Sequence, residues 1–245
     1  MIPKIEKDYI ADYTATFELE PGSTALIIVD MQYASAYRHT GLGKRLLEEG
    51  KEDLAAYRFD RIENIVVPTI KRLLSFFREH RLMIFHITIG SYADDYSDTL
   101  PYLKKLFQSS NNRLGQKEHE ILDELKPEPG EMLINKTTIG AFNSTNLEAI
   151  LHAYGINSLL FTGVSTNMCV ESTARDAADK GFRCVMVEDG CGATKQEYHD
   201  ATLSTFQRLF CKVQSSEEVV EKSYSKITQY MVKNAKQLLK EIQGS

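Results

Sequence analysis

The chain has 245 residues, of which 42% are hydrophobic and 26% are charged, and its formal net charge is −5. This composition is that of an ordinary globular protein, and the length allows one large domain or two small ones. The acidic balance argues against a nucleic-acid surface, since no basic excess is available to neutralise phosphates, and no apolar stretch is long enough to span a membrane.

The N-terminus and the cysteines indicate the cellular setting. Residues 1–8 contain no signal-peptide core. The four cysteines form no Cys-x-x-Cys pair, which argues against a structural zinc site. Without an export signal, we expect a reduced, cytoplasmic environment.

The first third of the chain predicts two strands separated by a helix. Residues 24–30 are a β-branched apolar run that ends in Asp30, which is typical of a buried parallel strand. Helical spacing of apolar residues follows over 60–80, where Pro68 predicts a kink or a restart. A second strand is expected over 82–89.

The rest of the chain predicts a regular alternation of strands and helices. After loops and short helices over 90–130, a third strand over 132–135 is followed by Lys136, and Ser144 is placed to cap a helix over 144–154. The remaining expected elements are strands over 158–162, 183–187 and 212–214, helices over 170–180 and 196–209, and a charged amphipathic helix over 217–242.

This alternation predicts an α/β fold: a three-layer αβα arrangement around a doubly wound, mostly parallel sheet of about six strands. No domain boundary is evident, so we expect a single domain over 1–245, with a core over 23–214, an N-terminal arm over 1–22 and the C-terminal helix. Ligands of such sheets bind beyond the carboxyl ends of the strands. Asp30, Lys136 and Cys169 each lie at or just past such an end, so they are expected to meet at one edge.

Cys169 lies where an apolar strand passes into a helix. In the first turn of a helix, unpaired N–H groups and the helix dipole favour a thiolate, which is the nucleophile of cysteine hydrolases. The other cysteines are interpreted as structural: Cys184 in a strand, Cys211 as a small buried hydrophobe and Cys191 in a loop near the same edge.

Several sequence motifs, in this order, resemble the isochorismatase-like cysteine hydrolase family over roughly residues 23–214. The resemblance implies the isochorismatase-like hydrolase fold. The motifs are Leu26-Ile27-Ile28-Val29-Asp30-Met31-Gln32, Asn135-Lys136 ahead of Gly140-Ala141-Phe142, Gly163-Val164-Ser165-Thr166-Asn167-Met168-Cys169-Val170, Thr173-Ala174-Arg175-Asp176-Ala177 and Val187-Glu188-Asp189.

By resemblance, Asp30, Lys136 and Cys169 form a catalytic triad. Asp30 would act as the general base, the Lys136 ammonium would favour both the carboxylate and the thiolate, and Cys169 would attack a carbonyl and hold the acyl group until water releases it. The resemblance also implies an oxyanion hole made of the backbone N–H groups of Ser165 and Cys169, and a non-proline cis peptide between Val164 and Ser165.

The presence of Cys169 favours hydrolysis of a C–N bond. The resemblance is to amidases that act on carbamoyl or ureido groups, such as N-carbamoylsarcosine amidase, ureidoacrylate amidase and biuret hydrolase. The expected partners are a small-molecule amide and water. Arg38 could pair with a substrate carboxylate, although an exposed loop arginine is the commoner case. The candidate substrate-binding residues are Gln32, Tyr37, Phe142, Asn143 and Asn167.

Nicotinamidases of the superfamily bind a divalent metal through an Asp-x-His pattern. This chain has no Asp-x-His and its six histidines are scattered, so we expect no metal and no other cofactor. The alternatives are a nicotinamidase-like amidase, an isochorismatase-type vinyl ether hydrolase and a non-catalytic protein for interaction or redox sensing. Because the family is commonly dimeric or tetrameric, a homo-oligomer is also expected, with the N-terminal arm and the C-terminal helix as contact elements.

Overall fold

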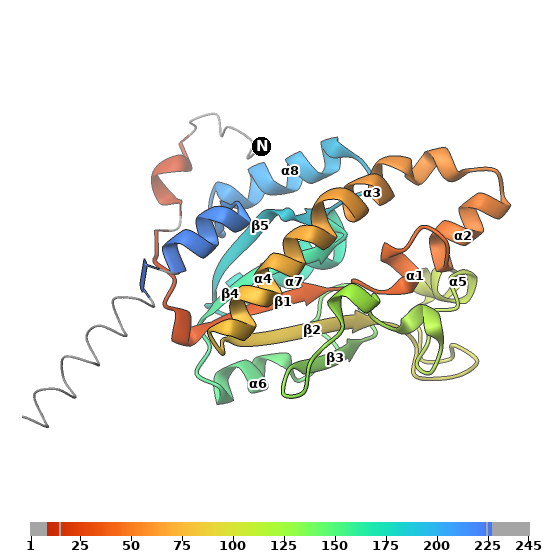
Figure 1. The fold of residues 1–245 in the computed structure, drawn as a ribbon, viewed down its shortest axis with the longest axis horizontal. Coiled ribbons are helices and arrows are strands. Elements are labelled where there is room, and N and C mark those ends of the chain that lie inside the picture. Colours follow the sequence, from red (N-terminus) through yellow and green to blue (C-terminus); the bar gives the residue numbers. More distant parts are fainter. Residues whose placement is uncertain (1–8, 15, 224, 227–245) are drawn as a thin grey trace, which may run out of the picture.

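The computed structural model describes residues 9–14, 16–223 and 225–226 (Figure 1). In this part of the chain, six parallel strands form one sheet in the order β3-β2-β1-β4-β5-β6. The strands are β1 (Thr24–Val29), β2 (Met83–Ile89), β3 (Met132–Lys136), β4 (Ser158–Val164), β5 (Arg183–Gly192) and β6 (Lys212–Gln214).

Helices cover both faces of this sheet, and α3 and α4 cross in front of it in Figure 1. The α-helices are α1 (Tyr33–Ala36), α2 (Gly41–Glu48), α3 (Ala56–Arg61), α4 (Val67–Glu79), α5 (Pro101–Ser109), α6 (Leu147–Ala153), α7 (Glu171–Asp179) and α8 (Gln196–Gln207). The shorter turns are η1 (Ala11–Tyr13), η2 (Pro21–Ser23), η3 (Glu52–Ala55), η4 (Ile62–Val66), η5 (Lys117–His119), η6 (Asp123–Leu125) and η7 (Thr166–Val170).

Alternate residues of the central strand supply two separate cores. Ala25, Ile27 and Val29 pack on the face covered by α6, α7 and α8, whereas Leu26 and Ile28 pack on the face covered by α3 and α4. All five side chains are at most 1% exposed. Side chains of a strand point alternately to opposite faces, so a strand that is apolar throughout is buried on both sides. This arrangement confirms the predicted three-layer, doubly wound α/β fold.

The helix predicted over 60–80 is interrupted just before its proline. The π-helical turn η4 (Ile62–Val66) separates α3 from α4, and Pro68 stands in the first turn of α4. Proline is tolerated there because the N–H groups of a first turn have no partner within the helix. The predicted kink or restart is therefore a π turn that joins two helices.

Two strands run further than the sequence predicted. β4 continues to Val164 and β5 to Gly192. Cys191 therefore lies in a strand and not in a loop: its thiol is buried and donates to the backbone oxygen of Phe161 at 3.5 Å. The prediction failed because Asp189-Gly190 indicated a loop, whereas β5 keeps pairing with β4 beyond an irregularity in the register.

Ser144 does not cap a helix. The helix α6 begins at Leu147, with Asn146 at the N-cap position. The Ser144 hydroxyl instead accepts a hydrogen bond from the backbone N–H of Thr137 and contacts the Thr138 hydroxyl, at 3.0 and 2.8 Å. Ser144 therefore holds the loop that follows β3, next to Lys136.

The strand order determines where a ligand can bind. β1 and β4 are neighbours, but the chain continues from β1 toward β2 and β3 on one side and from β4 toward β5 and β6 on the other. At such a point the connecting segments diverge and leave a crevice beyond the carboxyl ends of the strands. Asp30 follows β1, Lys136 ends β3, and Ser165 follows β4, so all three lie at this edge.

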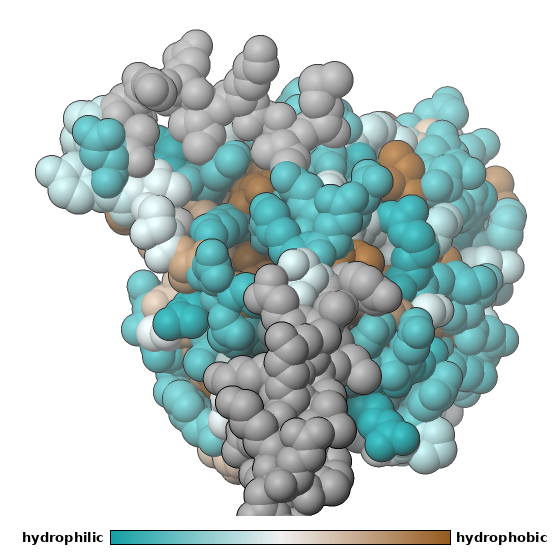
Figure 2. Space-filling model, turned by 60° about the vertical axis from the view of Figure 1, so that its left-hand side comes forward, coloured by the Kyte–Doolittle hydropathy of each residue, from teal (hydrophilic) through white to brown (hydrophobic). Residues whose placement is uncertain are grey.

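The terminal segments are described only in part. Residues 216–223 and 225–226 are helical, and Val219 packs in the core on the side of α4. The remainder of the C-terminal helix predicted over 217–242, like residues 1–8 of the N-terminal arm, lies outside the described residues. On the face in Figure 2, hydrophilic residues predominate and apolar residues occupy small separate areas. No helix in the described part of the chain is both long enough and apolar enough to cross a membrane.

Candidate active site

Asp30 lies directly beyond β1 in a left-handed backbone conformation, with φ of 53°. Aspartate is one of the few residues that tolerate this region. Its backbone N–H still donates to Ile87 of the neighbouring strand at 2.8 Å, so the sheet fixes the residue's position. The side chain is buried, with the whole residue only 2% exposed.

Lys136 is the last residue of β3 and its side chain is fully buried. Its ammonium donates to Oδ2 of Asp30 at 3.0 Å and to the backbone oxygen of Thr138 at 3.2 Å. A buried ammonium is stable only when its charge is paired and hydrogen-bonded. The fold therefore holds Lys136 and Asp30 as an ion pair, although β2 lies between their strands.

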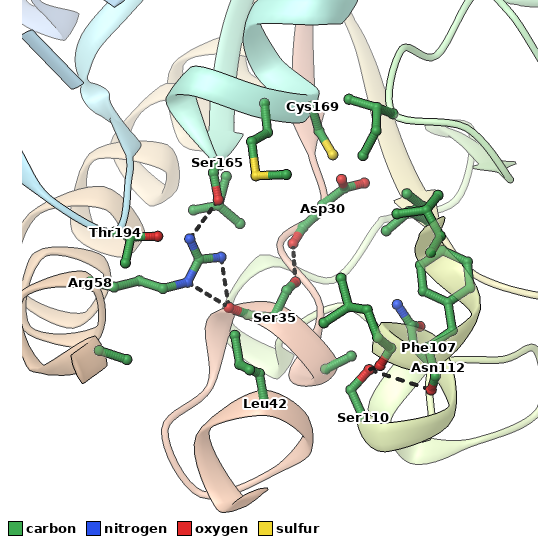
Figure 3. Close-up of a pocket in the computed structure, with 18 of the residues that line it drawn as sticks. Asp30, Ser35, Leu42, Arg58, Phe107, Ser110, Asn112, Ser165, Cys169 and Thr194 are labelled. Atoms are coloured by element: carbon green, nitrogen blue, oxygen red, sulfur yellow. Dashed lines mark hydrogen bonds between the residues drawn. The ribbon is translucent and has the colours of Figure 1, made fainter. Parts of the chain in front are cut away.

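Cys169 lies in the π-helical turn η7, and Figure 3 shows its sulfur pointing toward the Asp30 carboxylate. The pKa of the thiol is raised to about 12, mainly by burial and also by the negative charge of Asp30, whereas Lys136 lowers it. Burial and the carboxylate of Asp30 therefore oppose the thiolate that the start of a helix was predicted to favour.

The ion pair determines the resting protonation state of the site. Burial lowers the pKa of Lys136, but the attraction of Asp30 and then of Cys169 outweighs that effect and the net pKa is raised. Burial raises the pKa of Asp30, and the charge of Lys136 only partly offsets it. The 3.0 Å contact with the Lys136 ammonium favours the carboxylate form of Asp30, and the raised pKa of Cys169 favours a neutral thiol. Oδ1 of Asp30 has no hydrogen-bond partner among the described residues, so it is available to accept a proton.

A cis peptide joins Val164 to Ser165, at the junction between β4 and η7. Just before it, Gly163 has a φ of 105°, and a Cβ atom there would lie 2.0 Å from the backbone oxygen of Val29. Only glycine fits this close approach of two strands. The chain thus reaches the crevice between β1 and β4 with the backbone of Ser165 next to the turn η7 that carries Cys169.

A cavity of about 320 Å³ opens in front of Asp30, Ser165 and Cys169. Its other walls are mainly apolar and come from α1, α2, η3 and α5, as well as from strand ends. The apolar wall residues are Ala34, Leu42, Leu46, Leu54, Ala55, Ile89, Leu103, Leu106, Phe107, Ile139, Val164 and Met168, and the other polar ones are Ser35, Arg58, Ser110, Asn112 and Thr194. Such a concave, largely apolar site with a few polar groups is typical of a small-molecule pocket.

Arg58 is a functional candidate that the sequence analysis missed. It reaches the cavity from α3, is only 5% exposed, and donates to the Ser165 hydroxyl at 2.6 Å (Figure 3). Burial lowers the pKa of Arg58 to about 10, which leaves it a cation at neutral pH. The available signal was an arginine between apolar residues of a helix. Arg38, which the sequence suggested instead, pairs with Asp60 and Glu63 at 2.6 and 2.8 Å.

Gln32 lies outside the cavity. Its side-chain nitrogen donates to the backbone oxygens of Ile89 and His119, at 3.1 and 2.8 Å, and to the Asn112 side chain, at 3.3 Å. Its side-chain oxygen accepts from the Ile89 N–H at 2.8 Å. The amide that was expected to bind substrate is therefore used to tie the loop after β1 to the end of β2.

The other four predicted substrate-binding residues are also outside the lining of this cavity. Tyr37 packs its ring against Tyr33 and His39. Phe142 packs near Phe182.

Asn143 donates to Asp176 at 2.9 Å, and Asp176 also fills the space beside Gly140. Asn167 lies in η7, and its buried side-chain oxygen has no hydrogen-bond partner among the described residues. The helices α2, α3 and α5 wall the cavity in place of the predicted residues.

No group of three or more His, Cys, Asp or Glu side chains in the described part of the chain is arranged to hold a metal ion. His86 lies within β2 and contacts Glu131 at 2.8 Å, and His199 contacts Arg61 and Thr166 at 3.0 and 2.9 Å. The absence of a catalytic metal stays a prediction.

The fold and this site define a class: an α/β protein with a buried acid, amine and thiol at the switch point of a parallel sheet. The model of the isochorismatase domain matches residues 24–218, and this chain belongs to that family, as the sequence motifs predicted. Ureidoacrylate amidohydrolase RutB from Agrobacterium fabrum is 30% identical over 208 residues, covering 78% of this chain and 86% of that protein.

Solved structures share this fold. A cysteine hydrolase from Pseudomonas syringae pv. phaseolicola has a TM-score of 0.72 at 21% identity, over 87% of this chain and 98% of that one. N-carbamoylsarcosine amidase from Thermoplasma acidophilum has a TM-score of 0.57 at 24% identity, over 79% of this chain and 96% of that one.

Proposed function

We propose that this protein is a metal-independent cysteine hydrolase that cleaves the C–N bond of a small amide. The observation that carries the proposal is the buried pair of Asp30 and Lys136, with Nζ and Oδ2 3.0 Å apart, next to the Cys169 thiol that lines the cavity. A structural thiol needs no such pair, whereas a nucleophilic thiol needs a base within reach. The kinship with ureidoacrylate amidohydrolases supports amide chemistry.

The proposed reaction starts with the neutral thiol. Asp30 takes the thiol proton and becomes a neutral acid as the sulfur attacks the carbonyl carbon, and Lys136 stabilises the negative charge that develops on the sulfur. The C–N bond breaks, Asp30 returns the proton to the leaving nitrogen, and the acyl group remains bound to sulfur. Asp30 then takes a proton from a water molecule, which attacks the thioester and releases the acid and the thiol.

The oxyanion formed in both steps requires hydrogen-bond donors. The backbone N–H groups of Ser165 and Cys169 are proposed for this role because both residues line the cavity beside the sulfur. Removing one such donor typically costs about 10²–10³ in kcat.

The proposed leaving group is the nitrogen of a carbamoyl or ureido group. Two of the similar proteins, a ureidoacrylate amidohydrolase and an N-carbamoylsarcosine amidase, are named for such substrates. In that case ammonia leaves first, and the carbamoyl fragment bound to sulfur is hydrolysed afterwards.

The test compares Cys169→Ala with Cys184→Ala across a panel of ureas, carbamoyl amino acids and simple amides, with ammonia release as the readout. Cys184 is also buried, but it lies near the start of β5, away from the cavity. We expect Cys169→Ala to lose turnover and Cys184→Ala to keep it. Intact mass during turnover should show an acyl adduct that trypsin digestion maps to Cys169. Wild-type rates in Cys169→Ala would refute the cysteine mechanism.

A further inference from the structure

The guanidinium of Arg58 has donors that the protein does not use. Its Nε and Nη2 donate to the backbone oxygen of Ser35, at 3.2 and 3.0 Å, and Nη1 donates to the Ser165 hydroxyl. Each Nη carries a second N–H. For these, no acceptor is found among the described residues, although the residue is 95% buried and lines the cavity.

The charge of Arg58 is only partly balanced, because Asp30 attracts the guanidinium without forming an ion pair with it. Asp30 is the acidic residue among those that line the cavity, and its carboxylate is paired with Lys136. No ion pair joins Arg58 to a carboxylate in the described part of the chain. A buried cation without a counter-ion is unfavourable, so a ligand that supplies an anionic group there gains both the ion pair and the unused hydrogen bonds.

The walls indicate the body of that ligand. Leu42 and Leu46 of α2, together with Leu103, Leu106 and Phe107 of α5, present aliphatic and aromatic surface. In Figure 3, Cys169 and Asp30 lie on one side of the opening, Arg58 reaches in from another, and Leu42 and Phe107 face them. The cavity therefore combines a reaction centre, an anion-binding group and an apolar wall.

We propose that Arg58 is the specificity-determining residue and binds a carboxylate, so that the substrates are carbamoyl or related amides of acids with a bulky aliphatic or aromatic body. This inference rests on the proposed function, since it assigns the far end of the same substrate. Arginine suits the role because its planar fork matches the geometry of a carboxylate.

Two other roles for Arg58 make different predictions. Arg58 could act only as a positioning residue that holds Ser165 and Ser35, or only as a charge that favours the thiolate of Cys169. Either role would affect every substrate by the same factor. A carboxylate-binding role affects only substrates that carry the carboxylate.

The experiment compares N-carbamoyl-L-leucine with isopentylurea, which is the same compound without the carboxylate. Wild-type kcat/KM should be at least about 100-fold higher for the acid. Arg58→Gln should lower kcat/KM for the acid by about 100-fold, the usual effect of truncating one partner of a buried ion pair, and leave isopentylurea within about threefold. Arg58→Lys should keep part of the preference. Arg72→Gln on α4, whose side chain is 65% exposed, is the matched control and should change neither substrate.

A binding measurement tests the role of Arg58 independently of the proposed cysteine chemistry. Calorimetry with Cys169→Ala should show N-carbamoyl-L-leucine binding that weakens by about 100-fold when Arg58→Gln is added, whether or not the wild type turns it over. If Arg58→Gln lowered kcat/KM by the same factor for both compounds, the role of Arg58 would be overturned and the amidase proposal would remain intact. The same would hold if the wild type had equal kcat/KM for the two compounds. Unchanged binding in the double variant would overturn the role of Arg58 too.

Discussion

At the scale of single residues, the position of one proton decides how the site works. The Cys169 thiol has a pKa raised to about 12, mainly because it is buried. The carboxylate of Asp30 raises that pKa and the ammonium of Lys136 lowers it, so the two neighbours oppose each other. In the proposed mechanism, the thiolate therefore forms only when substrate arrives and the proton moves to Asp30.

This opposition gives a prediction for Asp30→Asn. The neutral amide removes the charge that raises the pKa of the Cys169 thiol, while Lys136 remains to favour the thiolate, so the pKa falls below about 12. At pH 8, iodoacetamide should alkylate Cys169 severalfold faster than in the wild type. Amide turnover should nevertheless fall by about 10²–10⁴, the usual contribution of a general base.

Asp176→Asn is the matched control for this experiment. Burial raises the pKa of Asp176 as well, but the residue bonds to Asn143 outside the cavity, so both alkylation and turnover should stay at wild-type values. Slower alkylation in Asp30→Asn than in the wild type would contradict the claim that Asp30 raises the pKa of the Cys169 thiol while Lys136 lowers it.

At the scale of elements, contacts from two helices support the short turn η7, which carries Cys169. Arg61 of α3 donates to Nε2 of His199 in α8 at 3.0 Å, and since a guanidinium only donates, Nδ1 of His199 carries the proton and donates to the Thr166 hydroxyl. Burial lowers the pKa of His199 to about 3, so its imidazole is uncharged at neutral pH. Irregular π turns often occur at functional sites and need such support.

The junction between β1 and β4 gives a second prediction, through two glycines. Gly163→Ala puts a Cβ atom against the Val29 backbone in a left-handed conformation and should destabilise the protein by more than about 2 kcal/mol. Gly181→Ala is the matched control: its φ is 87°, but nothing lies within 4 Å of the added atom, so about 1 kcal/mol is expected. Urea denaturation measures both, and equal losses would show that the close approach of the strands is unimportant.

The elements could be predicted from the sequence where local pattern and tertiary contact agree. The apolar β-branched runs gave β1 to β4 nearly in full, because a buried strand needs little beyond its own side chains. The end of β5 could not be predicted, because Asp189-Gly190 resembles a loop and only pairing with β4 keeps the strand extended. Ser144 has the chemistry of a helix cap, but the Thr137 N–H uses its hydroxyl.

At the scale of the whole molecule, the two halves of the sheet meet at the site. β1 and β3 bring Asp30 and Lys136 from one half, and the turn after β4 brings Cys169 from the other. The strand-end rule therefore allowed these three residues to be predicted as neighbours. The cavity walls could not be predicted in this way, because Leu46, Arg58 and Phe107 come from helices between the strands, whose packing the sequence pattern does not specify.

Because residues from both halves line one cavity, a ligand in it should stabilise the entire fold. We expect N-carbamoyl-L-leucine to raise the free energy of unfolding of Cys169→Ala by about 2.7 kcal/mol at 100 times its Kd. For a protein of this size, that corresponds to an increase in Tm of about 5–10 °C. Differential scanning calorimetry measures the shift.

The same measurement separates a ligand in the cavity from one on the surface of a single helix. A ligand that bridges α3, α5 and the strand ends stabilises the one native arrangement that brings them together, so the transition should move as a whole and stay a single peak. Isopentylurea at the same concentration should shift Tm less, because it lacks the group that Arg58 would bind. A split transition, or equal shifts for the two compounds, would mean that the ligand does not join the two halves through this cavity.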